Sequence, residues 1–251
     1  KFKVIIKKLI WETPDILRLT LVDPNNAQLP QWNAGAHIDI HLENNLIRQY
    51  SLSNDPANSD HYEIAVLKEK DGRGGSQFIH DTFSEGLEIE ISKPQNHFQL
   101  APEADFHIFL AGGIGITPIM AMIAELENQK KNYVLHYCTR TIENTAFHDR
   151  LSVNQNSGKI YLHHDNGNPK LGFNFKDYLK NYKKGTSLYY CGPPSFMDAI
   201  KLSTKDWPPS TVHCEYFSSP DNNLDTRDEK KVFKIKIAST GKVFTVPPES
   251  T

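Results

Sequence analysis

Cysteine is scarce in this chain of 251 residues, which contains only Cys138, Cys191 and Cys214. These three are too scattered for a disulfide framework or a metal cluster, and an odd, sparse count fits a reducing cytoplasm. Long apolar runs are also missing, and we find neither a bilayer-spanning stretch nor a secretory signal. Charges of the two signs nearly cancel, with a net charge of −2. Composition therefore gives no reason to expect binding to nucleic acid or to an anionic membrane.

Hydrophobic residues make up 38% and aromatic residues 10% of the sequence, as in a soluble globular protein. The chain is long enough for two domains, and its rhythm changes near residue 106. Before that point, short segments alternate or run apolar, with turn residues such as Pro24 and Pro56 between them. They predict an antiparallel six-stranded β-barrel over residues 1–102, with a helix at about 76–84 and strands at 2–9, 16–22, 37–42, 47–53, 62–68 and 87–92.

Beyond residue 106, strand patterns alternate with helical patterns. This alternation predicts an α/β domain with a doubly wound parallel sheet over residues 103–217, joined to the barrel by residues 94–102. Such sheets bind ligands at the carboxyl ends of their strands. The expected strands are 106–111, 133–138, 159–163, 187–191 and 211–216, and the expected helices are 118–129, 145–151, 174–182 and 194–204.

Arg48, Gln49, Tyr50 and Ser51 form the first motif, within the fourth expected strand. Side chains alternate across a strand, so Arg48 and Tyr50 should share one face, and Gln49 and Ser51 the other. An isoalloxazine ring needs a flat apolar wall, polar groups at its edge and a cation for its phosphate. Tyr50 can stack, Ser51 can donate a hydrogen bond, and Arg48 can grip phosphate as a fork. An ordinary barrel strand with a surface arginine has the same pattern, so this hypothesis needs context.

The context is a glycine-rich loop formed by Gly72, Arg73, Gly74, Gly75 and Ser76, just before an expected helix. Three glycines leave the backbone N–H groups free to approach an anion, and Arg73 adds a cation. Ser76 suits the N-cap position, and a helix N-terminus is a ready phosphate site. The alternative is a flexible glycine hairpin. Beside the first motif, the loop favours a phosphate-binding role.

A second glycine-rich turn contains Gly112, Gly113 and Gly115 and joins an apolar strand to a helix. Thr117 suits the N-cap of that helix, and Pro118 suits its first position, where a missing N–H costs nothing. The free N–H groups and the helix dipole can then face the pyrophosphate of a nicotinamide nucleotide. The spacing is not the Rossmann fingerprint, and a plain strand-to-helix turn is the alternative.

In this order the motifs resemble those of the ferredoxin-reductase-like flavoproteins. The finer resemblance is to the reductases of Rieske-type oxygenases, of the phthalate dioxygenase and vanillate demethylase type, and it covers both domains. It implies FMN as the flavin, with FAD as the alternative, and NADH as the donor, with NADPH possible. The turn after the second parallel strand leaves the donor open, because no acid directly follows Arg140 and Arg140 itself can meet a 2′-phosphate.

The resemblance also gives roles to residues late in the second domain. A Cys-Gly-Pro stretch, here Cys191, Gly192 and Pro193, would lie beside the nicotinamide and keep the hydride path narrow. Cys191 would transfer nothing itself, since hydride passes directly between the rings. A reactive thiol or a small buried apolar residue are its other interpretations. Glu215 would supply the acid and Phe217 the aromatic cover of the flavin, with Tyr216 as the second candidate.

The resulting site assignment has no metal ligands. His163, His164 and Asp165 could suggest a metal site, but no further ligands stand at a metal-like spacing. We therefore expect these three residues to be structural or to lie at the edge of the nucleotide site. The residues expected to be catalytic are Ser51, Cys191, Glu215 and Phe217. Those expected to bind cofactors are Arg48, Gln49, Tyr50, Ser51, Ala65, Val66, Leu67, Gly72, Arg73, Gly74, Gly75, Ser76, Gly112, Gly113, Gly115, Ile116, Thr117, Thr139, Arg140, Cys191, Gly192, Pro193 and Phe217.

The C-terminal segment has a different character. Residues 218–231 are polar and are expected to form a linker, and residues 232–237 and 240–246 are expected to pair as a hairpin. In the oxygenase reductases a plant-type [2Fe–2S] domain begins this way, but its C-x4-C-x2-C run is absent. We therefore expect residues 232–251 to be the start of a truncated, proteolysed or unobserved domain, with a decorative hairpin as the alternative.

The sequence thus predicts an NAD(P)H-dependent flavin reductase. It would take hydride from NADH onto FMN and pass single electrons, through the [2Fe–2S] domain of the full protein, to a Rieske-type terminal oxygenase. One alternative is an FAD-dependent reductase of a ferredoxin or quinone. Another is a flavin-binding regulatory subunit, although those carry a C-terminal cysteine cluster that is missing here. We expect a cytoplasmic monomer.

Overall fold

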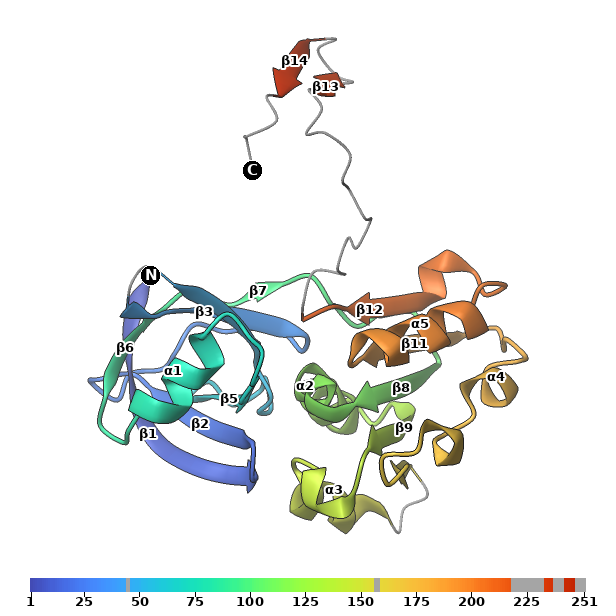
Figure 1. Ribbon diagram of the computed structural model, residues 1–251, viewed down its shortest axis with the longest axis horizontal. Helices are drawn as coiled ribbons and strands as arrows, with labels where there is room; N and C mark the ends of the chain where they lie inside the picture. The colour runs from blue at the N-terminus through green and yellow to red at the C-terminus, as the bar shows by residue number, and fades with distance from the viewer. Residues whose placement is uncertain (44–45, 156–158, 218–232, 237–241, 247–251) are drawn as a thin grey trace. The chain divides into compact units, whose positions relative to one another are not determined.

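The computed structural model describes the chain except for residues 44–45, 156–158, 218–232, 237–241 and 247–251 (Figure 1). The chain divides into two compact units, Lys1–Phe217 and Ser218–Thr251, and each is described by itself. The first unit holds a barrel and an α/β layer. In the described part of the chain, we find no helix with the length and apolar character needed to cross a bilayer.

The barrel is an antiparallel sheet whose ladder runs in the order β4-β3-β6-β1-β2-β5. Alternate side chains fill its interior, and Val4, Ile6, Leu19 and Leu21 are fully buried there. A short helix, α1 (Gly75–Thr82), follows β5 (Figure 1). The strands are β1 (Phe2–Thr13), β2 (Ile16–Val22), β3 (Ala36–His41), β4 (Ile47–Ser51), β5 (Tyr62–Leu67) and β6 (Glu88–Ile91).

Strands β4 and β5 stand at the two ends of this ladder and therefore face each other where the barrel closes. We call the line between these two strands the seam. Ser53, just after β4, closes one end of the seam: its N–H donates to the carbonyl of Glu63 at 2.8 Å, and its hydroxyl donates to the same oxygen at 3.2 Å. Arg48 and Leu67 lie toward the other end. The predicted fold class is correct, and the structure adds one strand that the sequence did not predict, β7 (Gln95–Asn96), paired with β3.

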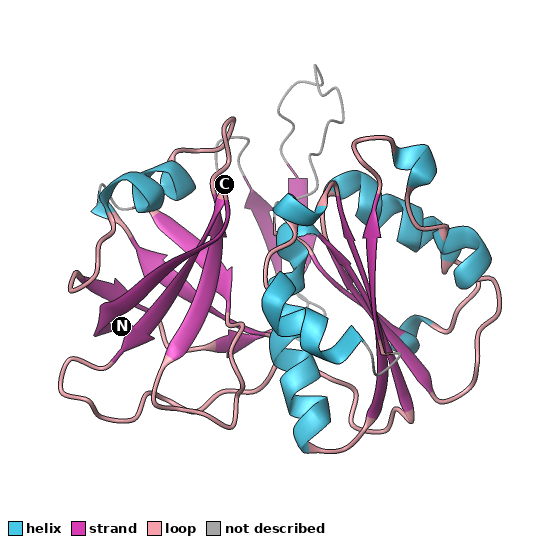
Figure 2. Cartoon of the chain, turned by 90° about the horizontal axis from the view of Figure 1, so that it is seen from below, coloured by secondary structure: helices cyan, strands magenta, loops and turns pink. Residues whose placement is uncertain are grey.

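The α/β layer is a five-stranded parallel sheet in the order β10-β9-β8-β11-β12, with helices on both faces (Figure 2). The order reverses between β8 and β11, which is the switch point of a doubly wound sheet. The strands are β8 (Phe106–Gly112), β9 (Asn132–Thr139), β10 (Ile160–His164), β11 (Thr186–Cys191) and β12 (Val212–Glu215), and the helices are α2 (Ile116–Asn128), α3 (His148–Gln155), α4 (Phe175–Tyr178) and α5 (Pro194–Ser203).

One apolar core runs from the barrel into this layer, where Ile119 and Met122 of α2 are fully buried in it. A second core lies among β8, β11 and α5, around Leu188 and Met197. The shared core ties the two parts of the first unit together through α2. The exact domain boundaries at residues 102 and 217 stay predictions.

Two predicted helix starts are wrong. Helix α1 begins at Gly75 with Gly74 as N-cap in the left-handed region, at φ 78°, so Ser76 is already inside the helix. Helix α2 begins at Ile116, because a 3-10 turn at Gly113–Gly115 has already wound the chain before Thr117. In both cases glycine supplies backbone freedom that outweighs the capping preference of a hydroxyl side chain.

Two other helices differ in length or place from the prediction. Helix α4 spans only Phe175–Tyr178, and the carbonyl of Leu179, its C-cap, accepts a hydrogen bond from the Trp207 indole at 3.0 Å. Helix α3 starts three residues later than expected, because Thr145 bonds the Thr141 carbonyl and Phe147 adopts a left-handed φ of 58°.

The second unit contributes a two-stranded antiparallel hairpin. Strand β13 (Phe233–Lys236) pairs with β14 (Val243–Val246), so that Phe233 lies opposite Val246. These strands were expected from the alternating sequence. The expected linker at 218–231, and the turn between the strands apart from Lys242, lie outside the described residues.

Candidate functional site

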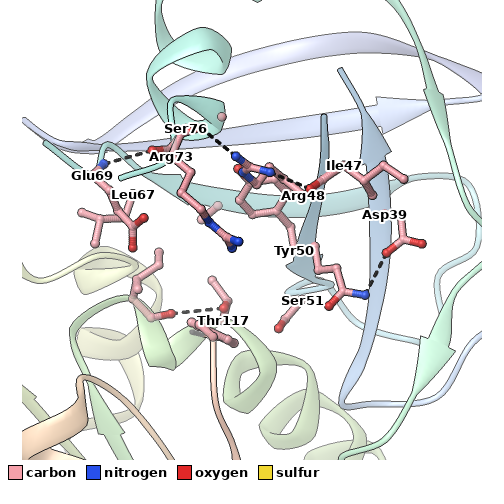
Figure 3. A pocket seen from close by; sticks show the side chains of 15 residues that line it. Asp39, Ile47, Arg48, Tyr50, Ser51, Leu67, Glu69, Arg73, Ser76 and Thr117 are labelled. Carbon is pink, nitrogen blue, oxygen red and sulfur yellow. Dashed lines mark hydrogen bonds between the residues drawn. The ribbon is translucent and has the colours of Figure 1, made fainter. Parts of the chain in front are cut away.

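A cavity of about 370 Å³ lies at the open end of the seam between β4 and β5 (Figure 3). The barrel contributes residues of three strands (β3, β4 and β5), the loop after β5 and the start of α1, and the α/β layer contributes three residues. The sequence-predicted residues around it are Arg48, Gln49, Tyr50, Ser51, Ala65, Leu67, Arg73, Gly75, Ser76, Thr117 and Phe217; Asp39, Ile47, Glu69 and Ile114 complete the lining.

Arg48 ties strand β4 to the glycine-rich loop. Its guanidinium donates to the carbonyls of Ile47 and Arg73, both at 2.8 Å. Gly75 makes room for it, since a Cβ there would come within 2.6 Å of the Arg48 Cγ. Two cationic side chains, Arg48 and Arg73, and the first turn of α1 therefore line the same cavity (Figure 3), an arrangement that suits a phosphate group.

Tyr50 and Ser51 lie further along the same strand. Burial raises the pKa of the Tyr50 phenol, outweighing the opposite effect of Arg48, so the ring is a neutral, half-buried platform. Gln49 donates from its amide to Asp39 at 3.0 Å. Alternation predicted two opposite faces for these four residues, yet all line the cavity. The reason is that β4 ends the ladder, so the cavity reaches around its free edge.

Ser51 connects the barrel with the end of β12. Its hydroxyl donates to Glu215 Oε2 at 3.2 Å. Burial raises the pKa of Glu215 to about 7, although the hydrogen bond from Ser51 acts in the opposite direction. A smaller hollow of about 290 Å³ adjoins this pair, lined by Ser51, Glu215, Phe217 and Tyr216 together with His37, Gln49, His97 and Cys214. Near neutral pH, Glu215 can therefore hold or release a proton beside the main cavity.

The predicted nucleotide turns meet at the switch point of the parallel sheet. Strands β8 and β11 are neighbours, with Ala111 opposite Cys191. A Cβ on Gly115 would overlap the Cys191 carbonyl, and a Cβ on Gly192 would come within 3.0 Å of the Gly112 Cα. Glycine is therefore required by close backbone packing at both turns, and Gly113 has a left-handed φ of 53°.

Cys191 is fully buried, and burial raises the pKa of its thiol well above the ordinary value. The thiolate is the reactive form of cysteine, so this environment argues against the reactive-thiol interpretation. Its strand position is opposite Glu215 on one side and Ala111 on the other. Cys191 thus lies at the end of the central strand β11, between β8 and β12, and does not line the main cavity.

The structure places several predicted residues away from the cavity lining. Val66 points into the barrel core, while its carbonyl accepts a hydrogen bond from the His80 ring at 2.8 Å. Thr139 ends β9, and its hydroxyl bonds Thr145 at 2.8 Å and His164 at 2.9 Å. The others that do not line it are Gly72, Gly74, Gly112, Gly113, Gly115, Ile116, Arg140, Cys191, Gly192, Pro193 and Glu215.

His163 has a packing role in the structure. Its Nε2 lies 2.9 Å from His136 Nδ1, and its ring lies 4.4 Å from that of Phe173. Asp39 and Glu69 are the polar lining residues that the sequence did not predict. Asp39 can be assigned to the site only once the strand register places it opposite Gln49. Glu69, two residues beyond Leu67, could have been predicted by extending the alternation of β5.

Comparison with known proteins gives consistent results. Residues 89–207 match the model of the dimethylamine monooxygenase subunit DmmA-like N-terminal domain. The chain is 38% identical to the tert-butanol monooxygenase / tert-amyl alcohol desaturase reductase subunit of Aquincola tertiaricarbonis, over 98% of this chain and 75% of that protein. It is 38% identical to the vanillate O-demethylase oxidoreductase of Pseudomonas sp. (strain HR199 / DSM 7063), over 99% and 78%. The chain belongs to the family of oxygenase reductases.

A solved structure of phthalate dioxygenase reductase, described as a modular structure for electron transfer from pyridine nucleotides to [2Fe–2S], supports the same assignment. It superposes with a TM-score of 0.83 at 36% identity, covering 98% of this chain and 76% of that one. The family and fold predicted from the motifs are confirmed. So is the prediction of a reductase component that takes electrons from NAD(P)H through a flavin.

Proposed function

We propose that the chain takes hydride from NADH onto FMN held in the seam cavity. In the full protein, single electrons then pass through a [2Fe–2S] domain to a Rieske-type terminal oxygenase. The observation that carries this proposal is the composition of the cavity. One hollow is lined by the Arg48 strand, the glycine-rich loop and three residues of the predicted nucleotide domain, Ile114, Thr117 and Phe217.

Several groups suit the flavin. Arg48, Arg73 and the N–H groups of the first turn of α1 would hold the phosphate, and Tyr50 would give the ring an apolar wall. Two arginines beside the first turn of α1 suit a ligand that finishes in a single phosphate, which supports FMN. FAD, the alternative, would continue past this end into a pyrophosphate and an adenosine.

The nucleotide would enter from the other side. The turns at Gly112 and Cys191 would receive its nicotinamide end and pyrophosphate, since the N-terminus of α2 lies beside them. Thr139 and Arg140, after β9, are our candidates for the ribose end. Because Phe217 lines both hollows and Tyr216 only the smaller one, Phe217 is the better candidate for the aromatic cover that yields to nicotinamide.

When bound, the flavin supplies the two-electron to one-electron conversion. The chain's own residues position the cofactors and balance the charge that develops on them. Ser51 and Glu215 form a hydrogen-bonded pair at the cavity wall, and the pKa of about 7 lets Glu215 take or return a proton near the operating pH. Gly115 and Gly192 let the two nucleotide turns pack backbone against backbone at the switch point.

The partner follows from the family: we propose an oxygenase, and specifically a Rieske-type one. The chain spans about three-quarters of the length of the relatives it matches, 75% and 78% for the two described above. We also propose a cytoplasmic monomer. Cys138, Cys191 and Cys214 are all free thiols, which fits a reducing compartment.

The test combines two measurements on the purified chain. Chromatography of the extracted flavin should give FMN, and recovery of FAD would favour the alternative reductase. Anaerobic mixing with NADH in a stopped-flow spectrometer should bleach the flavin absorbance, and ferricyanide should then restore it. A flavin that dithionite bleaches and neither NADH nor NADPH bleaches would contradict the proposal.

A further inference from the structure

A cluster of four charged side chains, three of them largely buried, crosses from the barrel to the α/β layer. Arg18 of β2 donates from Nε to Glu12 at 2.6 Å and also pairs with Glu63 of β5. Arg150 of α3 reaches Glu63 with two hydrogen bonds, at 2.8 and 3.0 Å, one to each carboxylate oxygen. We call these four residues, Glu12, Arg18, Glu63 and Arg150, the interdomain clamp.

The clamp is well enclosed on its barrel side. The side chains of Glu12, Arg18 and Glu63 are 12%, 11% and 7% exposed, whereas that of Arg150 is 40% exposed. Burial alone would raise the pKa of Glu63, but the hydrogen bonds and charge of Arg150, with the charge of Arg18, outweigh it and lower the pKa. Glu63 therefore stays ionised and binds the forked arginine from the other part of the unit.

A second limb of the clamp holds the backbone just before α3. Glu12 Oε2 accepts a hydrogen bond from the Phe147 N–H at 2.8 Å. Phe147 is buried in a left-handed conformation, which a non-glycine residue keeps only where its surroundings hold it. The Arg150 guanidinium lies 5.6 Å from the centre of the Phe147 ring. Both ends of this short segment are thus fixed to the barrel.

The clamp is placed where it can affect the cavity. Glu63, Ala65 and Leu67 are alternate residues of β5 and share one face, and the latter two line the cavity. On the other side, Phe147 and Arg150 follow the turn after β9 that begins at Thr139. The clamp therefore connects the strand that walls the cavity to the segment that follows the predicted nucleotide turn.

We propose that Glu63 and Arg150 are positioning residues, which hold the nucleotide domain at the distance from the flavin barrel that hydride transfer requires. This inference rests on the proposed function. Neither residue lines the main cavity. Their effect comes through geometry, to which the transfer step is very sensitive, since a misplacement of about 1 Å can cost on the order of a hundredfold in rate.

The experiment compares Arg150→Met and Arg150→Lys with a control, Lys3→Met. The control removes an ion pair with Glu88 on the surface of the barrel, which does not involve the α/β layer. Anaerobic stopped-flow at increasing NADH gives the limiting rate of flavin reduction and the apparent Kd, and the long-wavelength charge-transfer absorbance reports ring stacking. We expect Arg150→Met to lower the limiting rate at least about tenfold and to weaken that absorbance, with Kd within about threefold. Arg150→Lys should recover part of the rate, and Lys3→Met should match the native protein.

Dithionite provides the second readout, because this small reductant does not require the nucleotide domain. Its reduction of the flavin should proceed equally fast in all four proteins. Native-like NADH reduction in Arg150→Met would overturn the clamp's role, and so would equal slowing with NADH and dithionite. If Arg150→Met does not accumulate as a flavoprotein, Glu12→Gln removes the other limb and is judged by the same criteria. A native protein that dithionite reduces and NADH does not would instead overturn the proposed function, and the positioning role with it.

Discussion

Removing the Arg48 side chain should weaken flavin binding strongly. In the structure this guanidinium holds the carbonyl of Arg73 at 2.8 Å, so it organises the glycine-rich loop as well as offering charge to a phosphate. A hydrogen bond to a charged group contributes roughly 1.5–3 kcal/mol. At about 1.4 kcal/mol for each factor of ten, Arg48→Ala should raise the Kd for FMN by about ten- to a hundredfold. Because the loop loses its anchor too, we expect the upper end of that range.

The assay is a titration of the flavin-free protein with FMN, followed by quenching of the flavin fluorescence. Arg73→Ala is the matched control. It removes the second cationic side chain of the cavity but keeps the Arg73 carbonyl, and therefore the hold of Arg48 on the loop. Its effect should be several-fold smaller than that of Arg48→Ala, because one exposed charge is lost while the loop keeps its anchor.

Arg48→Lys separates charge from geometry. Lysine keeps the positive charge but cannot donate as a planar fork to a carbonyl and a phosphate at once, so its Kd should fall between those of the native protein and Arg48→Ala. If Arg48→Ala purifies with full flavin and unchanged affinity, Arg48 is not the anchor. If Arg73→Ala costs more than Arg48→Ala, the roles of the two arginines are reversed.

Three further predictions concern the nucleotide donor and the buried acid Glu215. NADH should be preferred to NADPH by a modest margin, because the family leans to NADH while Arg140 can meet a 2′-phosphate; a preference for NADPH above about tenfold, roughly 1.4 kcal/mol, in stopped-flow reduction would refute this. Gly115→Ala should weaken nucleotide affinity about tenfold or more and leave flavin content unchanged, because its Cβ would overlap the Cys191 carbonyl; equal losses of both in parallel titrations would contradict it. Burial raises the pKa of Glu215 from 4.5 to about 7, so its stabilising contribution is complete below pH 4.5 and is lost as pH rises through 7. In urea unfolding, Glu215→Gln should therefore gain roughly 2 kcal/mol relative to the native protein between pH 5 and pH 8, and an unchanged difference would show that the carboxyl is not buried in this way.

The strands could be predicted from sequence because their alternation follows directly from which face is buried. Residues 16–22 alternate cleanly and form β2 with those bounds. Helix starts were less predictable, because they depend on backbone turns that precede them. At Thr117 the hydroxyl suggested a cap, yet it donates to the Ile114 carbonyl at 3.1 Å from within a helix that the 3-10 turn had already begun.

The site was predictable in its parts but not in its assembly. Arg48 and Gly75 could be proposed from local motifs, whereas their contact requires the seam that brings β4 near the loop after β5. The interdomain clamp left no signal in the sequence. Glu12, Glu63 and Arg150 are isolated charges there, each consistent with a solvated surface, and only tertiary pairing shows that they meet.

The incomplete barrel explains why the cavity and the clamp lie on one strand. A strand at the end of a ladder has unpaired backbone groups, which a protein must cover or use. Ser53 covers one end of the seam by bonding the Glu63 carbonyl, while the other end stays open as the cavity. At the closed end, the Glu63 side chain binds Arg150 of the α/β layer. At the open end, residues of the same layer, such as Thr117 and Phe217, form part of the cavity wall. Weakening the clamp should therefore displace the nucleotide domain, while Arg48, Arg73 and the first turn of α1, which would hold the phosphate, all stay in the barrel. A change at Arg150 should for this reason affect hydride transfer more than flavin affinity.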